Sequence, residues 1–261
     1  MSGLELKDVT VTRGGRDLLA QVSLQLRPGE LTAILGPNGA GKTTFLSVAA
    51  GSLSPSSGSA SLDGVPLPEW DGLALARRRG VLPQLSGLDF PFSVEEVVSL
   101  GRHPHGDSHT PTGQAAVERA LALLELGPRR HALYPTLSGG ERQRTHAARV
   151  LAQLDGVSGT PWLLLDEPTS ALDLAHQHRL LARCRALVAE GTGVVAILHD
   201  PGLAARYADR WVVISAGRLV ADGTPREVLA GGTLAAALDV HIDVLEPEGR
   251  DFPVVVASPR P

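Results

Sequence analysis

A glycine-rich segment that directly follows an apolar run is the feature that most limits how this chain can fold. The apolar run covers residues 31–35, and residues 36–43 read Gly-Pro-Asn-Gly-Ala-Gly-Lys-Thr. A buried strand that opens into such a turn, and then into a helix, surrounds a concave anion site with backbone N–H groups. Glycines are needed there because a side chain would keep those N–H groups away from phosphate oxygens. The segment therefore predicts a site for a nucleoside triphosphate, formed by Gly36, Pro37, Asn38, Gly39, Ala40, Gly41, Lys42, Thr43 and Thr44.

Two side chains at the end of this phosphate loop carry the expected chemistry. Lys42 is expected to reach the β- and γ-phosphates, and the hydroxyl group of Thr43 is expected to hold Mg²⁺. The alternative interpretation is a chance glycine turn before a helix. The complete eight-residue pattern, placed between a strand and a helix start, argues against that alternative.

The hydrophobic pattern predicts further strands and helices around the loop. Residues 4–11 and 22–26 alternate apolar and polar positions, which predicts an antiparallel hairpin. Apolar runs at 162–166 and 194–198 are typical of strands buried on both faces of a parallel sheet. From residue 224 onward we expect small helices and one late apolar run. Strands that alternate with helices around a phosphate loop predict a three-layered α/β fold.

The region between Pro83 and Pro161 differs, because its apolar residues recur at helical spacing and it shows no convincing strand. Within it, residues 101–113 are rich in Gly, Pro and His. We expect them to form a solvated connecting loop and not a metal site, since no Cys or carboxylate pattern with ligand spacing surrounds the histidines. The predicted division is a nucleotide-binding core of residues 1–84 and 157–222, a helical subdomain of residues 85–156, and a C-terminal extension of residues 223–261.

Polar residues that follow the predicted strands are the catalytic candidates. Asp166 ends an apolar strand, where Mg²⁺ needs an anchor, and Glu167 comes next and can polarise an attacking water as general base. His199 can contact the γ-phosphate or orient that water. The alternative is a histidine at a strand end whose ring nitrogens only form hydrogen bonds with backbone groups. Gln84 follows a short predicted strand, and its side-chain amide can coordinate Mg²⁺ or the attacking water. The alternative interpretation is a surface glutamine without a function.

A second glycine-bearing turn leads into a helix at Ser138, Gly139 and Gly140. Ser138 is the predicted N-cap and hydroxyl donor, and the helix start is a second anion site. The alternative interpretation is an ordinary capped helix start that has no binding function. Two phosphate-type sites for one nucleotide are explained by a head-to-tail homodimer, in which each phosphate loop is completed by the Ser138 turn of the other copy.

Composition excludes several classes of protein. The 261 residues carry a formal net charge of -4, so the basic surplus typical of nucleic-acid binding is absent and no nucleic-acid partner is expected. Cys184 is the single cysteine, which excludes an internal disulfide and fits a reducing cytosol. No apolar segment approaches the length of a membrane span, and the N-terminus lacks the pattern of a signal peptide.

Taken together, these motifs resemble the ATP-binding subunits of ATP-binding cassette (ABC) transporters. The matching segments, in order, are residues 36–43, Gln84, 137–141, 163–167, 170–173 and His199. The resemblance implies an α/β fold of the P-loop NTPase (RecA-like) type: a parallel sheet core with an antiparallel β subdomain and an inserted helical subdomain. It also implies a dimer that encloses two ATP–Mg²⁺, drives a membrane permease and lies peripherally on the cytoplasmic face of the cell membrane. Asp173 is then expected in the loop that links the two sites.

A finer resemblance points to importers of iron complexes. Residues 81–84, 90–98 and 101–102 resemble the haem, siderophore and cobalamin importers, and residues 171–178 with 203–210 resemble the haem subgroup. This implies a periplasmic or surface haem-binding protein as an indirect partner. The alternatives are a ferric-siderophore or cobalamin importer and, ranked lower, a soluble ABC ATPase that acts on the ribosome or DNA. One departure is Arg13, which stands near where the family places an aromatic residue against adenine.

Overall fold

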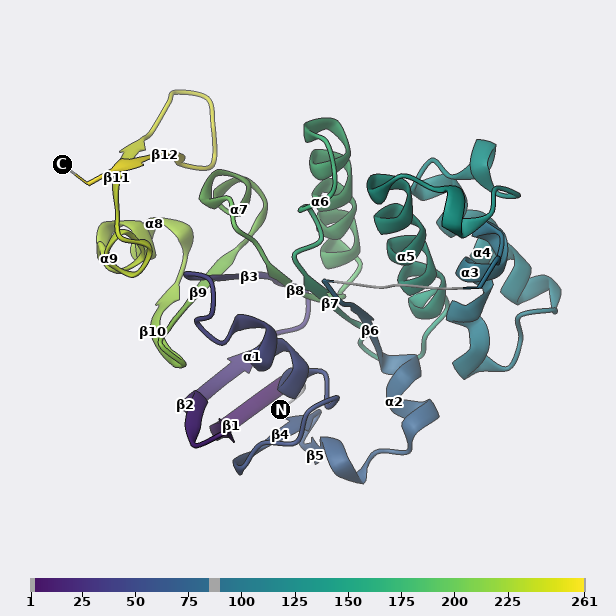
Figure 1. The fold of residues 1–261 in the computed structure, drawn as a ribbon, viewed down its shortest axis with the longest axis horizontal. Coiled ribbons are helices and arrows are strands. Elements are labelled where there is room, and N and C mark those ends of the chain that lie inside the picture. Colours follow the sequence, from purple (N-terminus) through teal and green to yellow (C-terminus); the bar gives the residue numbers. More distant parts are fainter. Residues whose placement is uncertain (1–2, 85–89, 261) are drawn as a thin grey trace. The chain divides into compact units, whose positions relative to one another are not determined.

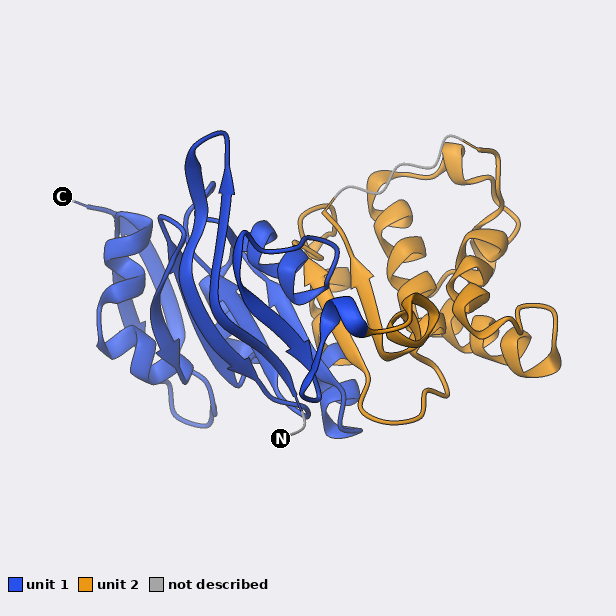
Figure 2. Cartoon of the chain, turned by 90° about the horizontal axis from the view of Figure 1, so that it is seen from below, with its two compact units in different colours: residues 1–69, 184–261 blue, residues 70–183 orange. Residues whose placement is uncertain are grey.

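The computed structural model describes residues 3–84 and 90–260. The chain forms two compact units, one of residues 1–69 and 184–261 and one of residues 70–183 (Figure 2). The predicted start of the helical subdomain, at residue 85, lies outside the described residues, and the three-part division stays a prediction.

The first unit contains a four-stranded antiparallel sheet with the order β2-β1-β4-β5. Its strands are β1 (Leu4–Arg13), β2 (Arg16–Leu26), β4 (Ser57–Leu62) and β5 (Val65–Pro66). In β1 and β2 most apolar positions are buried and most polar ones exposed, as the alternating sequence requires. The predicted hairpin is therefore confirmed. Helix α1 (Lys42–Ala49) packs against β1 and β2 (Figure 1), and a 3₁₀ turn, η1, covers Leu67–Glu69.

The same unit holds the parallel strands that carry the phosphate loop. Strand β3 (Leu31–Leu35) lies parallel to both β8 (Gly193–Ile197) and β9 (Arg210–Ser215), and β10 (Arg218–Gly223) pairs with β9 in the antiparallel direction. Every residue of β3 and β8 is buried. Burial on both faces explains why these strands read as continuous apolar runs in the sequence. Helix α7 (Pro201–Tyr207) follows β8.

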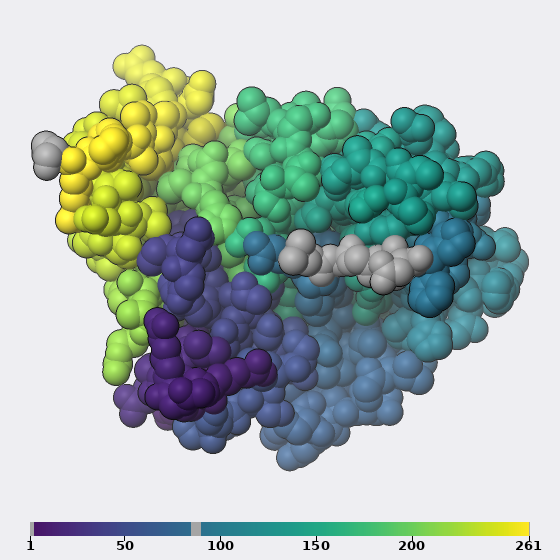
Figure 3. Space-filling view, viewed as in Figure 1, coloured from purple at the N-terminus to yellow at the C-terminus, as the bar shows by residue number. Residues whose placement is uncertain are grey.

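The C-terminal part contains a hairpin that was not predicted from the sequence. After α8 (Pro225–Ala230) and α9 (Thr233–Leu238), strands β11 (Val240–Leu245) and β12 (Val254–Pro259) pair in the antiparallel direction, and β12 contacts α7. The small helices expected from residue 224 onward are α8 and α9, and the expected late apolar run lies in β12, but β11 was not expected. The alternation Val-His-Ile-Asp-Val at 240–244 is the sequence pattern that indicates β11. Figure 3 shows these last residues, in yellow, at the surface.

The second unit combines one pair of parallel strands with helices. Strand β6 (Arg79–Leu82) lies parallel to β7 (Trp162–Asp166). The helices are α2 (Gly72–Arg78), α3 (Val94–Ser99), α4 (Pro111–Leu123), α5 (Gly139–Leu154) and α6 (Leu174–Ala189, whose end belongs to the first unit), with 3₁₀ turns η2 (Leu100–His105), η3 (Gly127–Arg129) and η4 (Tyr134–Thr136). Among residues 90–161 there is no strand, only an isolated bridge between Ser93 and Leu133, so the predicted helical character is confirmed there.

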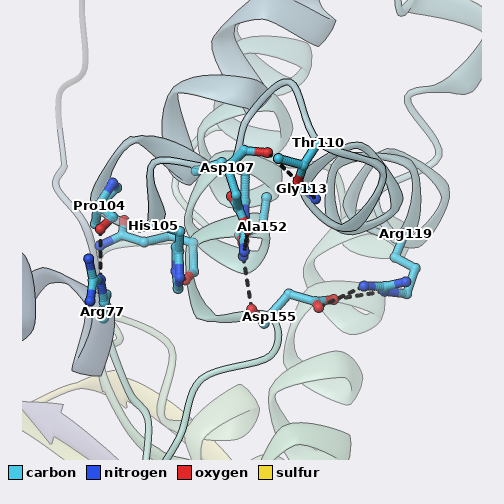
Figure 4. Close-up of polar contacts among 11 residues, drawn as sticks. Arg77, Pro104, His105, Asp107, Thr110, Gly113, Arg119, Ala152 and Asp155 are labelled. Atoms are coloured by element: carbon cyan, nitrogen blue, oxygen red, sulfur yellow. Dashed lines mark hydrogen bonds and ion pairs between the residues drawn. The ribbon is translucent and has the colours of Figure 1, made fainter.

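Residues 101–113, expected to form a solvated loop, are instead fixed to the end of α5. Arg102 is only 3 % exposed; it forms two hydrogen bonds with Asp107 and donates to the carbonyl groups of Ala152 and Asp155, each at 2.8 Å. Figure 4 shows this group, in which Arg119 also binds the Asp155 carboxylate. The expectation of a solvated loop was wrong at Arg102, because the last carbonyl groups of a helix need donors and Arg102 supplies them.

Candidate functional site

The glycines of the phosphate loop have a packing role beside the role expected for them. Gly36, Gly39 and Gly41 all have positive φ angles, of 140°, 74° and 103°. A Cβ atom on Gly36 would lie 2.0 Å from the carbonyl oxygen of Ile214, and one on Gly41 would lie 2.4 Å from that of Leu18. Backbone atoms cannot yield to such contacts, so both positions exclude a side chain even before a nucleotide binds. The loop is thus pressed against β9 and against β2.

Hydrogen bonds hold the loop in the same place. The amide of Gly217, in the turn between β9 and β10, donates to the carbonyl group of Ala40 at 2.9 Å, and the carbonyl group of Gly217 accepts from Ala20 of β2 at 2.8 Å. The turn residues Ala216 and Gly217 both have positive φ angles, which suits a two-residue hairpin. The sequence shows this turn, but nothing in it indicates that the turn supports the phosphate loop.

Lys42 lies over the loop that precedes it. Its side chain is buried, with 6 % of the residue exposed, and its ammonium group donates to the carbonyl groups of Gly36 at 2.7 Å and Pro37 at 2.8 Å. Thr43 is exposed and Thr44 is half-buried. The charged end of Lys42 is therefore held at the loop, where the predicted phosphates would lie.

His199 belongs to the same edge of the sheet as the loop. Strands β3 and β8 are parallel neighbours in which Ile34 pairs with Ile197, and the amide of Leu198 donates to the carbonyl group of Ile34 at 3.2 Å. The next residues along the two strands are thus brought to one edge, which places Gly36 near His199. His199 is exposed. This is the carboxyl-end edge at which α/β sheets bind ligands.

In the second unit, the structure brings two predicted residues into direct contact. Gln84 and Glu167 each follow a strand of the parallel pair β6–β7, in which Leu82 pairs with Leu165. The amide nitrogen of Gln84 donates to Glu167 Oε2 at 2.8 Å. Asp166, the last residue of β7, is only 4 % exposed. Three of the predicted metal and catalytic residues therefore lie together at one end of this strand pair.

Glu167 has an unusual backbone conformation that the sequence did not reveal. Its φ angle is 49°, in the left-handed region that residues other than glycine seldom occupy. The backbone amide and the hydroxyl group of Ser170 both donate to the carbonyl group of Glu167, at 3.3 and 3.0 Å. Such conformations persist where the surrounding structure enforces them, and they concentrate at functional sites.

The Ser138 turn forms the start of α5 as predicted. The Ser138 hydroxyl accepts from the amide of Glu141 at 3.3 Å, and Glu141 Oε2 accepts from the backbone amide and the hydroxyl group of Ser138, each at 2.9 Å. This is a capping box, which satisfies N–H groups at the start of a helix. Gly139 has open space around it, whereas a Cβ atom on Gly140 would lie 3.1 Å from the carbonyl oxygen of Ala171.

Asp173 lies in the segment that meets this helix start. Gln143 of α5 donates to the carbonyl group of Pro168 at 3.4 Å, so the start of α5 contacts residues 168–171, just before Asp173. The Asp173 carboxylate accepts from the backbone amide of His176 at 2.9 Å and bonds to its ring at 2.8 Å. These bonds lower the pKa of Asp173, the backbone bond most. Asp173 is exposed and acts here as the N-terminal cap of α6.

The predicted site residues thus fall into two sets. The first unit holds the phosphate loop and His199, and the second holds Gln84, Asp166, Glu167, the Ser138 turn and Asp173. Within residues 3–84 and 90–260, no three or more His, Cys, Asp or Glu side chains are grouped so that they could hold a metal ion. No helix in that part of the chain has the length and apolar character needed to cross a membrane.

Comparison with known proteins identifies relatives along the whole chain. The family model described as ABC transporter matches residues 19–170. The hemin import ATP-binding protein HmuV of Shewanella denitrificans is 46% identical over 254 residues, which cover 97% of this chain and 100% of that protein. The protein of the same name from Pseudomonas entomophila is 47% identical over 97% of this chain and 99% of its own length.

Solved structures with the same fold include an ATP-binding subunit and a dimeric cassette. An ATP-binding subunit of an ABC transporter has a TM-score of 0.77 and 26% identity, covering 91% of this chain and 96% of that one. The dimeric bacterial ABC transporter cassette MJ0796 has a TM-score of 0.74 and 27% identity, covering 85% of this chain and 99% of its own. These similarities confirm the predicted P-loop NTPase fold.

Proposed function

This chain belongs to the ABC transporter family, and on that premise we propose that it is the ATPase subunit of a haem importer. It binds ATP and hydrolyses it to drive transport. The observation that carries the haem assignment is the identity of 41% to 47% with proteins named for hemin import, over 97% or more of this chain. In an importer the cargo is recognised by the permease and the binding protein. The sequence identity therefore indicates common descent with haem importers, and it does not indicate a haem site on this chain.

The predicted site residues include the groups that phosphoryl transfer requires. Lys42 and the loop amides hold the phosphates, Glu167 acts as general base, and His199 contacts the γ-phosphate or orients the water. Mg²⁺ prefers oxygen ligands, and the candidates are the Thr43 hydroxyl, the Asp166 carboxylate and the Gln84 amide oxygen. Gln84 suits this role because its nitrogen already bonds to Glu167, which leaves the oxygen end of the amide for a cation. Bound Mg²⁺ would neutralise charge that develops on the phosphates.

The ATP site is completed by a second copy of the chain. In support, the Ser138 turn has an exposed serine and an open glycine, so a partner's nucleotide can approach it. A dimeric relative has the same fold. In such a head-to-tail dimer the phosphate loop of one copy faces the Ser138 turn of the other. The permease lies in the membrane, and this subunit is bound to its cytoplasmic face.

Replacing Ser138 by arginine tests the shared site. The long cationic side chain is expected to prevent closure of the dimer, so turnover should fall to below about 1% of wild type, a loss typical of removing groups that act in the transition state. Binding of ATP to isolated monomers should persist, because the phosphate loop belongs to the other unit. Phosphate release and binding of a fluorescent ATP analogue measure the two quantities. Turnover at the wild-type rate would remove the shared site from the proposal.

The cargo is tested by reconstituting the subunit with its co-purified permease in liposomes. We expect haem-loaded binding protein to raise ATPase activity at least about three-fold over unloaded protein, since closure of the dimer is coupled to the loaded state. Binding protein loaded with a ferric siderophore or with cobalamin serves as the matched comparison. If only one of these two raises the ATPase activity, that compound is the cargo and haem is not. The proposed role as an ATPase subunit would still hold.

A further inference from the structure

The hydroxyl group of Ser138 is already engaged by a charged neighbour in this structure. Its single proton is directed to Glu141 Oε2 at 2.9 Å, the same oxygen that accepts the Ser138 backbone amide. Glu141 Oε1 in turn pairs with Arg129 Nε at 2.9 Å. The Glu141 side chain is 17 % exposed and that of Arg129 is 60 % exposed. A serine, a carboxylate and a guanidinium thus form a short chain from the helix start to the surface.

This arrangement has an electrostatic consequence for any phosphate that binds at Ser138. The bonds from Ser138 lower the pKa of Glu141, the backbone bond most, so the side chain is a carboxylate near pH 7. A hydroxyl has one proton, so donating it to a phosphate means withdrawing it from Glu141. The phosphate then lies within a few ångströms of the carboxylate, and like charges at such distances repel.

We propose that Glu141 is a positioning residue that fixes the Ser138 hydroxyl and weakens ATP binding by its charge, and that Arg129 offsets this charge. The inference rests on the proposed function, because it requires Ser138 to face a nucleotide of the second copy. It assigns a specific role to the one acidic residue of the turn. Charge at position 141 sets how readily the two halves of the site close on ATP, whereas the bond from the Glu141 backbone amide to the Ser138 hydroxyl holds that oxygen at the helix start.

The chain offers a matched control for the charge of a capping-box glutamate. At the start of α8, Thr224 and Glu227 form the same motif, with distances of 2.8, 2.9 and 3.3 Å against 2.9, 2.9 and 3.3 Å at Ser138. Glu227→Gln removes the same charge from the same local structure in the other unit. Any general effect of losing one carboxylate, or of an altered cap, is therefore measured separately.

The test is the KM for ATP of four variants of the full chain, with kcat and the melting temperature measured alongside. Glu141→Gln keeps an oxygen that accepts from Ser138, and it should lower KM about 3- to 10-fold, the size expected for one charge about 4 Å away in a water-like medium. Arg129→Gln should raise KM by a similar factor. In the double variant Glu141→Gln/Arg129→Gln, KM should return close to the wild-type value, since the opposite effects of the two charges on the phosphate add. Glu227→Gln should leave KM unchanged.

Several outcomes separate this inference from the proposed function. An unchanged or raised KM in Glu141→Gln would overturn it, and so would an unchanged or lowered KM in Arg129→Gln, because the guanidinium would then not act on the bound phosphate through its charge. If Ser138→Arg inactivates the enzyme while Glu141→Gln behaves as wild type, the shared site stands and only the role of Glu141 fails. If Ser138→Arg is fully active, the shared site itself fails, and Glu141→Gln should then also leave KM unchanged.

Discussion

Lys42→Ala is expected to reduce ATP turnover to below about one thousandth of the wild-type rate. Lys42 is buried at the phosphate loop, and its ammonium group is held by the carbonyl groups of Gly36 and Pro37. A cation fixed in a site of low exposure stabilises charge on transferring phosphates more strongly than a solvated one, and losing about 4 kcal/mol of such stabilisation corresponds to a thousand-fold loss of rate. Phosphate release at saturating ATP measures the effect.

The chain contains its own control for this change. Lys7, on β1, is the other lysine of the sequence, and it is exposed. Lys7→Ala should retain the wild-type rate, since that side chain lies on the solvent-exposed face of the antiparallel sheet. The melting temperature of Lys42→Ala shows whether loss of the two bonds to the loop carbonyls disturbs the fold. A folded Lys42→Ala protein with normal turnover would contradict the assignment of the phosphate loop.

Glu167→Gln is expected to bind ATP, to accumulate as an ATP-bound dimer and to hydrolyse about 10²- to 10⁴-fold more slowly than wild type. An amide cannot accept the proton of the attacking water, and general-base catalysis contributes factors of this size. The bond from Gln84 can persist, because a glutamine oxygen still accepts it. In the proposed dimer, hydrolysis is the step that opens the closed form, so the variant should remain dimeric. Size-exclusion chromatography with ATP and single-turnover hydrolysis measure the two results.

Glu125 provides the matched control for Glu167. It is also a glutamate with a left-handed backbone, with a φ angle of 55° against 49°, and it lies in the same unit. Its side chain pairs with Arg179 at 2.7 Å and takes no part in the proposed site. Glu125→Gln should hydrolyse ATP at close to the wild-type rate. A Glu167→Gln protein that stays monomeric in ATP and hydrolyses normally would remove Glu167 from the role of base.

Much of the fold follows from the sequence because its signals are local. The apolar runs at 31–35 and 162–166 correspond to β3 and β7 with the expected bounds. Ser138 was predicted as an N-cap, and the structure confirms it. Strand alternation, caps and glycine turns depend on residues a few positions apart, so they can be read without knowing the rest of the chain.

The site was predictable in the identity of its residues and not in their contacts. The phosphate loop, Asp166, Glu167 and Gln84 stand out by residue type and by their place after strands. Their roles stay predictions that the variants above test. The direct bond between Gln84 and Glu167, and the engagement of the Ser138 hydroxyl by Glu141, depend on side-chain positions that no pattern specifies. Glu141 was recognised only as part of a motif, although its capping-box spacing from Ser138 was a readable signal.

The sequence by itself determined that this chain carries a phosphate loop after a buried strand, because glycine spacing and an apolar run suffice to specify it. The tertiary structure decided what holds that loop in place. Ile214 and Leu18 exclude a side chain at Gly36 and Gly41, and Gly217 supports Ala40. These contacts join residues far apart in the chain, and they exist only because β9 lies beside β3 and the β9–β10 turn bonds to β2. Sheet pairing between distant segments is set by the packing of the whole core, so it cannot be read from local sequence.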